Sequence, residues 1–204
     1  MGEFLTLQAI LENPRSVTRR IERDDETLTV RPLGHSDTAM LCDYFDRLSD
    51  RTKDWFAPHE FTHEVAARLC RDLLSENTLR LVAVTESDAP RIVAYFILQF
   101  GLRPPERERF DGYGVALPDE TTCSLAPSVA DAYQNTGLGS AILEQTVDVA
   151  RRAGREKMIL FGGVGLQNPR AVHFYRKFGF RKVPADAPED RKFDMVLDVV
   201  PEEE

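Results

Sequence analysis

The spacing of apolar and polar residues predicts a chain in which strands and helices alternate. Apolar and polar positions alternate over residues 27–32, which is typical of a strand with one buried face. Residues 79–85 and 92–100 are strongly apolar and flank Ser87-Asp88-Ala89-Pro90, so they are expected to be two strands joined by a turn. Further strands are expected over residues 121–129, 158–161 and 193–199.

Four-residue repeats of apolar positions predict helices between these strands. Val65, Leu69 and Leu73 repeat in this way, and Thr62 is a suitable N-cap for their helix. Ser36 marks the start of another predicted helix, which continues to residue 48. Amphipathic segments predict two further helices, over residues 138–154 and 169–178.

Composition sets the boundaries of the predicted domain. Residues 1–26 are polar and charge-dense, so they are expected to be an N-terminal extension, in which residues 4–11 could form a short helix. Residues 27–200 are expected to form a single domain, because 204 residues suffice for one substantial core. Residues 201–204 read as a solvated acidic tail. Proline, glycine and charged residues predict an exposed loop over residues 103–114.

Charge and cysteine content narrow the class of protein. The formal net charge of −8 argues against a protein that binds a nucleic-acid backbone. No run of about 18 apolar residues is present, which argues against a membrane span, and the first residues do not resemble a secretory signal. Cys42, Cys70 and Cys123 are odd in number and widely spaced, so we expect reduced thiols and a cytoplasmic location.

A glycine turn precedes the long helix predicted over residues 138–154. Gln134-Asn135-Thr136-Gly137-Leu138-Gly139 would place backbone N–H groups and the positive end of a helix dipole around one point, which suits a diphosphate. A P-loop would need a Gly-Lys pair, which the chain lacks. A dinucleotide-binding loop would need glycine at Ile142. The turn alone is also compatible with a plain structural helix start.

A second motif follows in Asn168-Pro169-Arg170-Ala171-Val172-His173-Phe174-Tyr175-Arg176-Lys177-Phe178-Gly179-Phe180. Asn168 suits an N-cap, Pro169 the first helical position and Gly179 the helix stop. The two segments resemble the paired signatures of the GNAT acyltransferases, Gln/Arg-x-x-Gly-x-Gly and Asn-x-x-Ala-x-x-x-Tyr-x-x-x-Gly-Phe. The resemblance extends over residues 27–199 in layout and is specific over 121–180.

The resemblance implies a fold and a reaction. The fold is an α/β domain with a mixed, mostly antiparallel central sheet, helices on both faces, and splayed strands that form a cleft for coenzyme A. The reaction is transfer of an acetyl group from acetyl-CoA to a primary amine by direct attack, without a metal. The acceptor, a small molecule or a protein amine, stays open, as does assembly into a homodimer. A regulatory module that binds acyl-CoA without turnover is the alternative on the same fold.

The resemblance also implies roles for individual residues. The backbone of Val129 is expected to pair with the pantetheine arm and to polarise the thioester carbonyl. Tyr175 matches the proton donor to the leaving thiolate, with a core tyrosine as the alternative. Glu120 is the favoured general base, ahead of Asp119 and Asp111. The other residues expected to bind coenzyme A are Gln134, Asn135, Thr136, Gly137, Leu138, Gly139, Ser140, Asn168 and Ala171.

Two features depart from this pattern. The family strand before the glycine turn carries a bulge, and Pro127 in this chain removes a backbone donor there, so it is either the bulge or a sign that the match is shifted by one residue. His59-Glu60-Phe61-Thr62-His63 matches the zinc motif His-Glu-x-x-His, which needs both imidazoles on one helical face. Because Thr62 reads as a helix cap, the two histidines should straddle a loop–helix junction. A segment lining an acceptor cleft is favoured over a zinc site.

Overall fold

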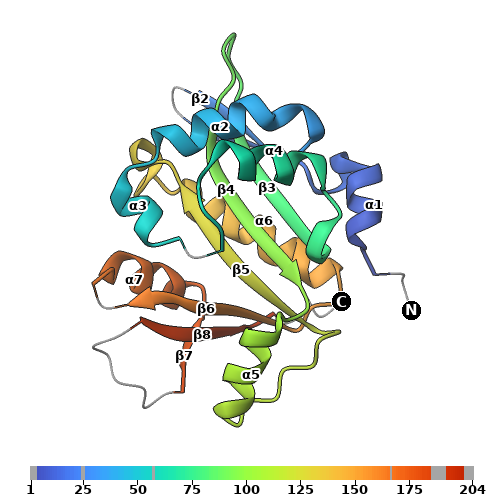
Figure 1. Cartoon of the computed structure of the whole chain (residues 1–204), viewed down its shortest axis with the longest axis vertical. Helices are drawn as coiled ribbons and strands as arrows, with labels where there is room; N and C mark the ends of the chain where they lie inside the picture. The colour runs from blue at the N-terminus through green and yellow to red at the C-terminus, as the bar shows by residue number, and fades with distance from the viewer. Residues whose placement is uncertain (1–3, 24–25, 57, 166, 185–191, 200–204) are drawn as a thin grey trace.

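One sheet runs through the molecule (Figure 1). The structure is a computed structural model that describes residues 4–23, 26–56, 58–165, 167–184 and 192–199. The described part of the sheet has the order β1-β2-β3-β4-β5-β6-β8-β7, and neighbouring strands are antiparallel except for the parallel pair β5 and β6. The strands are β1 (Arg19–Arg23), β2 (Glu26–Pro32), β3 (Thr78–Thr85), β4 (Ile92–Phe100), β5 (Thr122–Val129), β6 (Lys157–Gly165), β7 (Arg181–Val183) and β8 (Lys192–Asp198).

The parallel pair β5–β6 is bonded only at its beginning. Residues 122–124 of β5 pair with residues 157–159 of β6, and no later pair joins them in the described chain. The pairing of β6 with β8 also shifts register between Leu160 and Val164. Figure 1 shows β5 and β6 separating toward the side where α3 (Asp50–Asp54) and α7 (Pro169–Lys177) lie. The sheet is therefore open in its middle.

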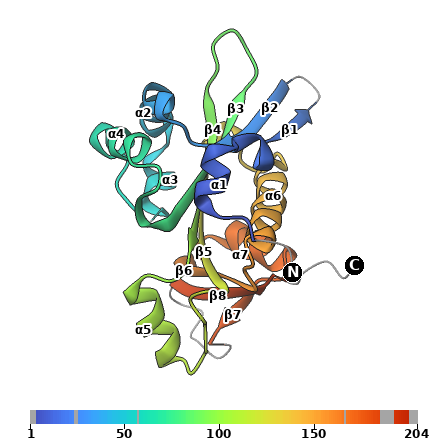
Figure 2. The ribbon, with the colours of Figure 1, turned by 90° about the vertical axis from the view of Figure 1, so that its right-hand side faces the viewer.

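Helices cover both faces of the sheet, and Figure 2 shows the two layers. Helices α2 (Thr38–Arg47), α3 and α4 (His63–Arg71) lie on one face, and α1 (Leu7–Glu12) and α6 (Leu138–Arg152) lie on the other. Helix α7 contacts β6. These findings confirm the predicted fold class, a mixed and mostly antiparallel sheet between helices. No helix in the described residues is long and apolar enough to cross a membrane.

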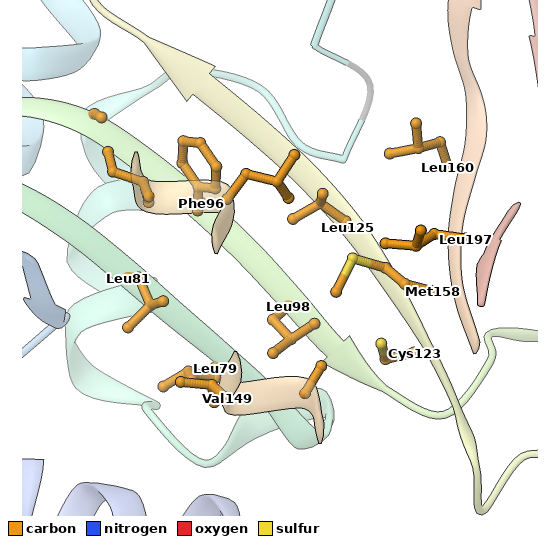
Figure 3. Packing of buried hydrophobic residues seen from close by; sticks show 14 of the residues in the cluster. Leu79, Leu81, Phe96, Leu98, Cys123, Leu125, Val149, Met158, Leu160 and Leu197 are labelled. Atoms are coloured by element: carbon orange, nitrogen blue, oxygen red, sulfur yellow. The ribbon is translucent and has the colours of Figure 1, made fainter. Parts of the chain in front are cut away.

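The sheet divides the hydrophobic core. Because successive strand residues point to opposite faces, Leu79 and Leu81 of β3 pack with Val149 of α6, whereas Val82 packs with α2 and α4. Figure 3 shows the first of these clusters, in which Met158 of β6 lies among side chains from the neighbouring strands. Burial on both faces explains why β3 and β4 are apolar along almost their whole length.

The N-terminal residues differ from the predicted polar extension. The helix expected within residues 4–11 is present as α1, and its Leu7 and Ile10 are buried in the core. Residues 19–23 form an edge strand, β1, along β2. This strand has a weak sequence signal because Ile21 is the only apolar residue among four charged ones. The acidic tail lies outside the described residues.

The prediction of an exposed loop over residues 103–114 is wrong, because these residues form α5 (Pro104–Gly112). Pro104 and Pro105 occupy the first helical turn, where a missing N–H costs little. The carboxylate of Glu106 accepts a hydrogen bond from the Arg103 N–H at 2.7 Å and so caps the start of the helix. Phe110 anchors the helix in a small separate core. Composition suggested a loop, while these local signals start a helix.

The other predicted elements agree with the structure apart from their ends. Strands β2, β3, β4, β5 and β8 lie where the sequence predicts them, and the Thr62 hydroxyl caps α4 by accepting from the Val65 N–H at 3.2 Å. Helix α2 begins at Thr38, after a single 3₁₀ turn, rather than directly after Ser36. Strand β6 continues to Gly165, beyond the end predicted at residue 161, and the short strand β7 was not predicted.

Candidate active site

A cavity of about 460 Å³ lies between β5, the glycine turn and the start of α7; we call it the loop cavity. Most of the residues predicted to bind coenzyme A contribute to its wall, although they come from segments far apart in the sequence. The predicted residues that line the loop cavity are Val129, Gln134, Asn135, Gly137, Gly139, Ser140, Asn168, Ala171 and Tyr175. The structure thus brings the two sequence motifs together around one space.

The glycine turn presents its backbone to the loop cavity. Gly137 has φ 84° and is the N-cap of α6, so it holds a left-handed conformation that suits glycine. A Cβ atom added there would meet nothing within 4 Å. Gly137 offers no capping side chain, so the first amides of α6 are open to a ligand from outside the helix. Arg51 and Arg170, which the sequence motifs did not single out, also line this cavity and add positive charge.

The pairing of β5 with β4 shows no bulge. Residues 123–129 pair with residues 94–100 in a continuous register. Of the two readings of Pro127, a bulge at this residue is therefore wrong for the pairing with β4. Proline fits here for a different reason, which follows from the direction of the backbone N–H groups.

The Val129 N–H points away from β4. The Ala130 N–H donates to the Val93 carbonyl at 2.9 Å, which makes Ala94 and Val129 a pair without mutual hydrogen bonds. The N–H of Val129 is therefore directed toward the side from which β6 has separated. Pro127 is two residues earlier and faces the same side, so its missing N–H removes no hydrogen bond to β4.

Gln134 and Asp131 hold the turn in place. The Gln134 amide donates to the Val129 carbonyl at 3.1 Å and to the Thr52 hydroxyl at 3.2 Å. The Asp131 carboxylate accepts from the Ser49 N–H at 3.0 Å and from the hydroxyls of Ser49 and Thr52 at 2.7 and 2.9 Å. Burial alone would raise the pKa of Asp131, but these hydrogen bonds outweigh it and lower the pKa. Gln134 therefore supports the turn as well as lining the cavity.

Three predicted residues do not line the loop cavity. The Thr136 hydroxyl accepts from the Arg23 guanidinium at 2.8 Å, outside the cavity wall. Leu138 is buried in the core. Glu120 is exposed and lies just before β5, at the opposite end of that strand from Val129. Its side chain lines neither this cavity nor the one described next.

A second cavity, of about 300 Å³, lies where β5 and β6 have separated; we call it the sheet cavity. Its walls include residues 124–127 of β5, Leu160, Phe161 and Val164 from β6, and Arg80 from β3. Four residues line both cavities, which therefore meet at them. These four are Trp55, Phe56, Pro127 and Tyr175.

Tyr175 lies at this junction and is 7% exposed. Its ring packs against Phe174 and Phe180, with ring centroids 5.1 and 5.4 Å apart. Its hydroxyl has no hydrogen-bond partner within the described residues. Burial raises the pKa of the Tyr175 phenol, so the group is protonated at neutral pH. Tyr175 thus packs as a core residue and still has a protonated hydroxyl at the meeting point of the two cavities.

The two histidines of the His-Glu-x-x-His match have separate surroundings. His63 is the first residue of α4, and its Nε2 lies 2.9 Å from the carboxylate of Asp46. His59 precedes the helix, and its Nε2 lies 3.2 Å from the Tyr95 hydroxyl. Burial lowers the pKa of His59. The predicted loop–helix junction between them is confirmed. The described residues contain no group of three or more His, Cys, Asp or Glu side chains arranged to hold a metal.

Comparison with known proteins shows the family to which the chain belongs. The sequence model of the acetyltransferase (GNAT) family matches residues 46–180. The chain belongs to this family. Acetyltransferases of the GNAT family use acetyl-CoA as the acetyl donor. Acetyltransferase PA5475 of Pseudomonas aeruginosa is 26% identical over 137 residues, and the chain spans 66% of the length of that curated relative.

Solved structures show the same fold at low sequence identity. The GNAT domain of S. lividans PAT matches with TM-score 0.68 and 20% identity, over 91% of this chain and 98% of that one. Ribosomal-protein-S5-alanine acetyltransferase from Vibrio fischeri matches with TM-score 0.62 and 16% identity, over 88% and 94%. The structure of yncA from Salmonella typhimurium with its cofactor acetyl-CoA matches with TM-score 0.57 and 18% identity, over 87% and 96%.

The glycine turn generates a prediction for a matched pair of variants. A Cβ at Gly139 would make only ordinary contacts, the nearest at 3.7 Å with Phe174, so the backbone tolerates a small side chain. Gly139→Asp adds a carboxylate where we expect the diphosphate, whereas Gly139→Asn has the same shape without the charge. Coulomb repulsion of about 1–4 kcal/mol at close range should raise the Kd for coenzyme A at least about fivefold in Gly139→Asp relative to Gly139→Asn. Titration calorimetry measures both, and equal Kd values would mean that no phosphate lies at this turn.

Proposed function

We propose that this protein transfers an acetyl group from acetyl-CoA to a primary amine. The observation that carries the proposal is the meeting of two cavities at Tyr175, where β5 and β6 separate. Acetyl-CoA is assigned to the loop cavity, with its diphosphate at the glycine turn. The amine is assigned to the sheet cavity. The thioester and the amine would then meet at the junction.

Three properties of the loop cavity suit coenzyme A. The open space beside Gly137 lets phosphate oxygens approach the backbone, and Arg51 and Arg170 supply positive charge. The Val129 N–H, unused by β4, is free to bind the amide-containing pantetheine arm much as a strand edge binds a peptide. Asn168 uses its side-chain oxygen to cap α7, accepting from the Ala171 N–H at 3.2 Å, which leaves its NH₂ group to donate to a ligand.

The proposed reaction needs one nucleophile, one oxyanion donor and one acid. A neutral amine attacks the thioester carbon, so that a C–N bond forms and the C–S bond breaks. Negative charge develops on the carbonyl oxygen, and we assign its stabilisation to the Val129 N–H. The departing sulfur gains a proton, which we assign to the Tyr175 hydroxyl. The proton that the attacking nitrogen loses passes to water, from which the tyrosinate regains its own. Alkyl amines have a pKa of about 10.4, so they are mostly ammonium ions at neutral pH and must lose a proton before they attack. Glu120 is not part of this proposal because its side chain lines neither cavity.

Thiol release tests the proposal directly. The protein is incubated with acetyl-CoA and a panel of amines, and free coenzyme A is measured with a thiol reagent. We expect release that depends on the amine, together with a rise of several degrees in Tm, because a ligand at 100 times its Kd stabilises the native state by about 2.7 kcal/mol. A rise in Tm without release for any amine would instead indicate the regulatory acyl-CoA-binding module. No rise in Tm would contradict both readings.

Tyr175→Phe tests the assignment of the acid. The substitution keeps the ring and its packing but removes the one transferable proton. A general acid contributes on the order of 10²–10⁴-fold in rate, and since a thiolate is already a good leaving group we expect a fall in kcat near the lower end. The Kd for acetyl-CoA should change little, and kcat/KM should fall with kcat.

Tyr113→Phe is the matched control, because the Tyr113 hydroxyl binds Asp194 at 2.8 Å and Tyr113 lines neither cavity. This variant should keep wild-type kcat. If Tyr175→Phe turns over within about twofold of wild type, Tyr175 is a packing residue and water protonates the sulfur.

A further inference from the structure

The sheet cavity contains a buried guanidinium that has few protein partners. Arg80 of β3 lines this cavity and is 6% exposed. Its Nη1 donates to the Thr78 carbonyl over a long 3.4 Å, and its Nη2 lies 3.7 Å from the Glu76 carboxylate, beyond hydrogen-bond reach. Its Nε is buried and has no hydrogen-bond partner among the residues that the structure describes. A guanidinium has five N–H donors, and apart from the bonds to the Thr78 carbonyl and the Tyr95 hydroxyl those of Arg80 are unused within the described chain.

The groups around Arg80 do not neutralise its buried positive charge. The side chain of Glu76 is 64% exposed and therefore largely solvated. Glu106 also lines the cavity, but its carboxylate is bound to Arg103 at 2.6 Å. Tyr95 is a neutral neighbour, whose buried phenol has a raised pKa despite the charge and the hydrogen bond of Arg80. A buried cation whose counter-ion is largely solvated and out of hydrogen-bond reach is poorly compensated, and an anion brought by a ligand would relieve that cost.

The net charge of the sheet-cavity wall also favours an anionic ligand. Its described wall carries three cations and two carboxylates, which leaves an excess of one positive charge. These side chains are Arg68, Arg80, Arg103, Glu76 and Glu106. One excess charge suits a monoanion, and a guanidinium matches the two oxygens of a carboxylate with parallel hydrogen bonds. The rest of the wall includes Trp55, Phe56 and Phe161, which suit an apolar body.

Building on the proposed function, we infer that the acetyl acceptor is an amine that also carries a carboxylate, as an amino acid does. Its carboxylate binds Arg80, and its amine lies toward Tyr175, one of the four residues that line both cavities. Arg80 is then a residue that determines specificity for the acceptor.

Binding of product analogues tests this inference without requiring turnover. The probes are N-acetylglycine, N-acetylmethionine and N-acetylphenylalanine, each compared with its carboxamide by titration calorimetry. Hydrogen bonds to charged groups contribute enough to make at least one acid bind roughly 10- to 100-fold more tightly than its amide. In Arg80→Met this preference should fall to about twofold or less. The preference of Arg80→Lys should be intermediate, because lysine keeps the charge but cannot form the two parallel hydrogen bonds of a guanidinium.

Arg107→Met is the matched control, since it removes a surface cation that is paired with Asp119 at 2.6 Å and lines neither cavity. Its preference for the acid should stay within about twofold of wild type. Equal binding of acid and amide by the wild type, binding of no acid at millimolar concentration, or an unchanged preference in Arg80→Met would each overturn the inference. The comparison of acids with their amides in the wild type tests the inference even if Arg80→Met fails to fold.

Thiol release distinguishes failure of this inference from failure of the proposed function. If amines without a carboxylate release coenzyme A as fast as amino acids do, acetyl transfer stands and the carboxylate inference is overturned. If the wild type prefers the acids and Arg80→Met abolishes that preference, but no amine releases thiol, the Arg80 carboxylate site stands and acetyl transfer fails.

Discussion

The early end of the β5–β6 pairing is the constraint on which the proposed site depends. After residue 124 the two strands no longer share hydrogen bonds, although both remain anchored in the sheet by β4 and β8. Pro127 gives a physical reason for this end. Its backbone nitrogen faces β6 and has no hydrogen to donate, so continuing the parallel ladder past it would lose a bond. The opening leaves the Val129 N–H without a strand partner.

The separated strands also explain why the two cavities differ in chemistry. On one side, the start of α6 and two arginines provide N–H groups and positive charge around the glycine turn. On the other side, aromatic and apolar side chains surround a buried arginine. Tyr175 reaches the junction from α7, whose contact with β6 holds it beside the opening. A diphosphate-bearing donor and a mostly apolar acceptor would thus be bound by different physical means and still meet.

Local signals predicted much of the fold and of the loop cavity. Asn168, Gly137 and Thr62 act through their own backbone or the next few residues, so the sequence alone indicated where helices begin. Composition used alone gave a wrong prediction at α5. Its charged residues suggested a loop, although the prolines at its start and the apolar Phe110 are compatible with a helix. Glu120 was chosen by its nearness to a strand, and only the assembled sheet shows that it lies at the end opposite Val129.

The sheet cavity was not predicted because it depends on pairings between distant segments. Arg80 did carry a signal, as a charged residue inside an apolar strand, but its depth and its missing partners follow only from the packing of β3 against its neighbours. In the same way, the consequence of Pro127 depends on which side of β5 its nitrogen faces. That direction is set by the register with β4.

Amide hydrogen exchange at Val129 tests the central claim most directly. The register pairs Ser128 with Tyr95 through mutual hydrogen bonds, so the Ser128 amide should exchange slowly in the free protein and with coenzyme A alike. The Val129 amide, directed into the opening, should exchange much faster in the free protein and become slow when coenzyme A binds. Equal protection of the two amides in the free protein would show that β5 and β6 are not separated there. A Val129 amide unaffected by saturating coenzyme A would show that the opening does not hold the pantetheine arm.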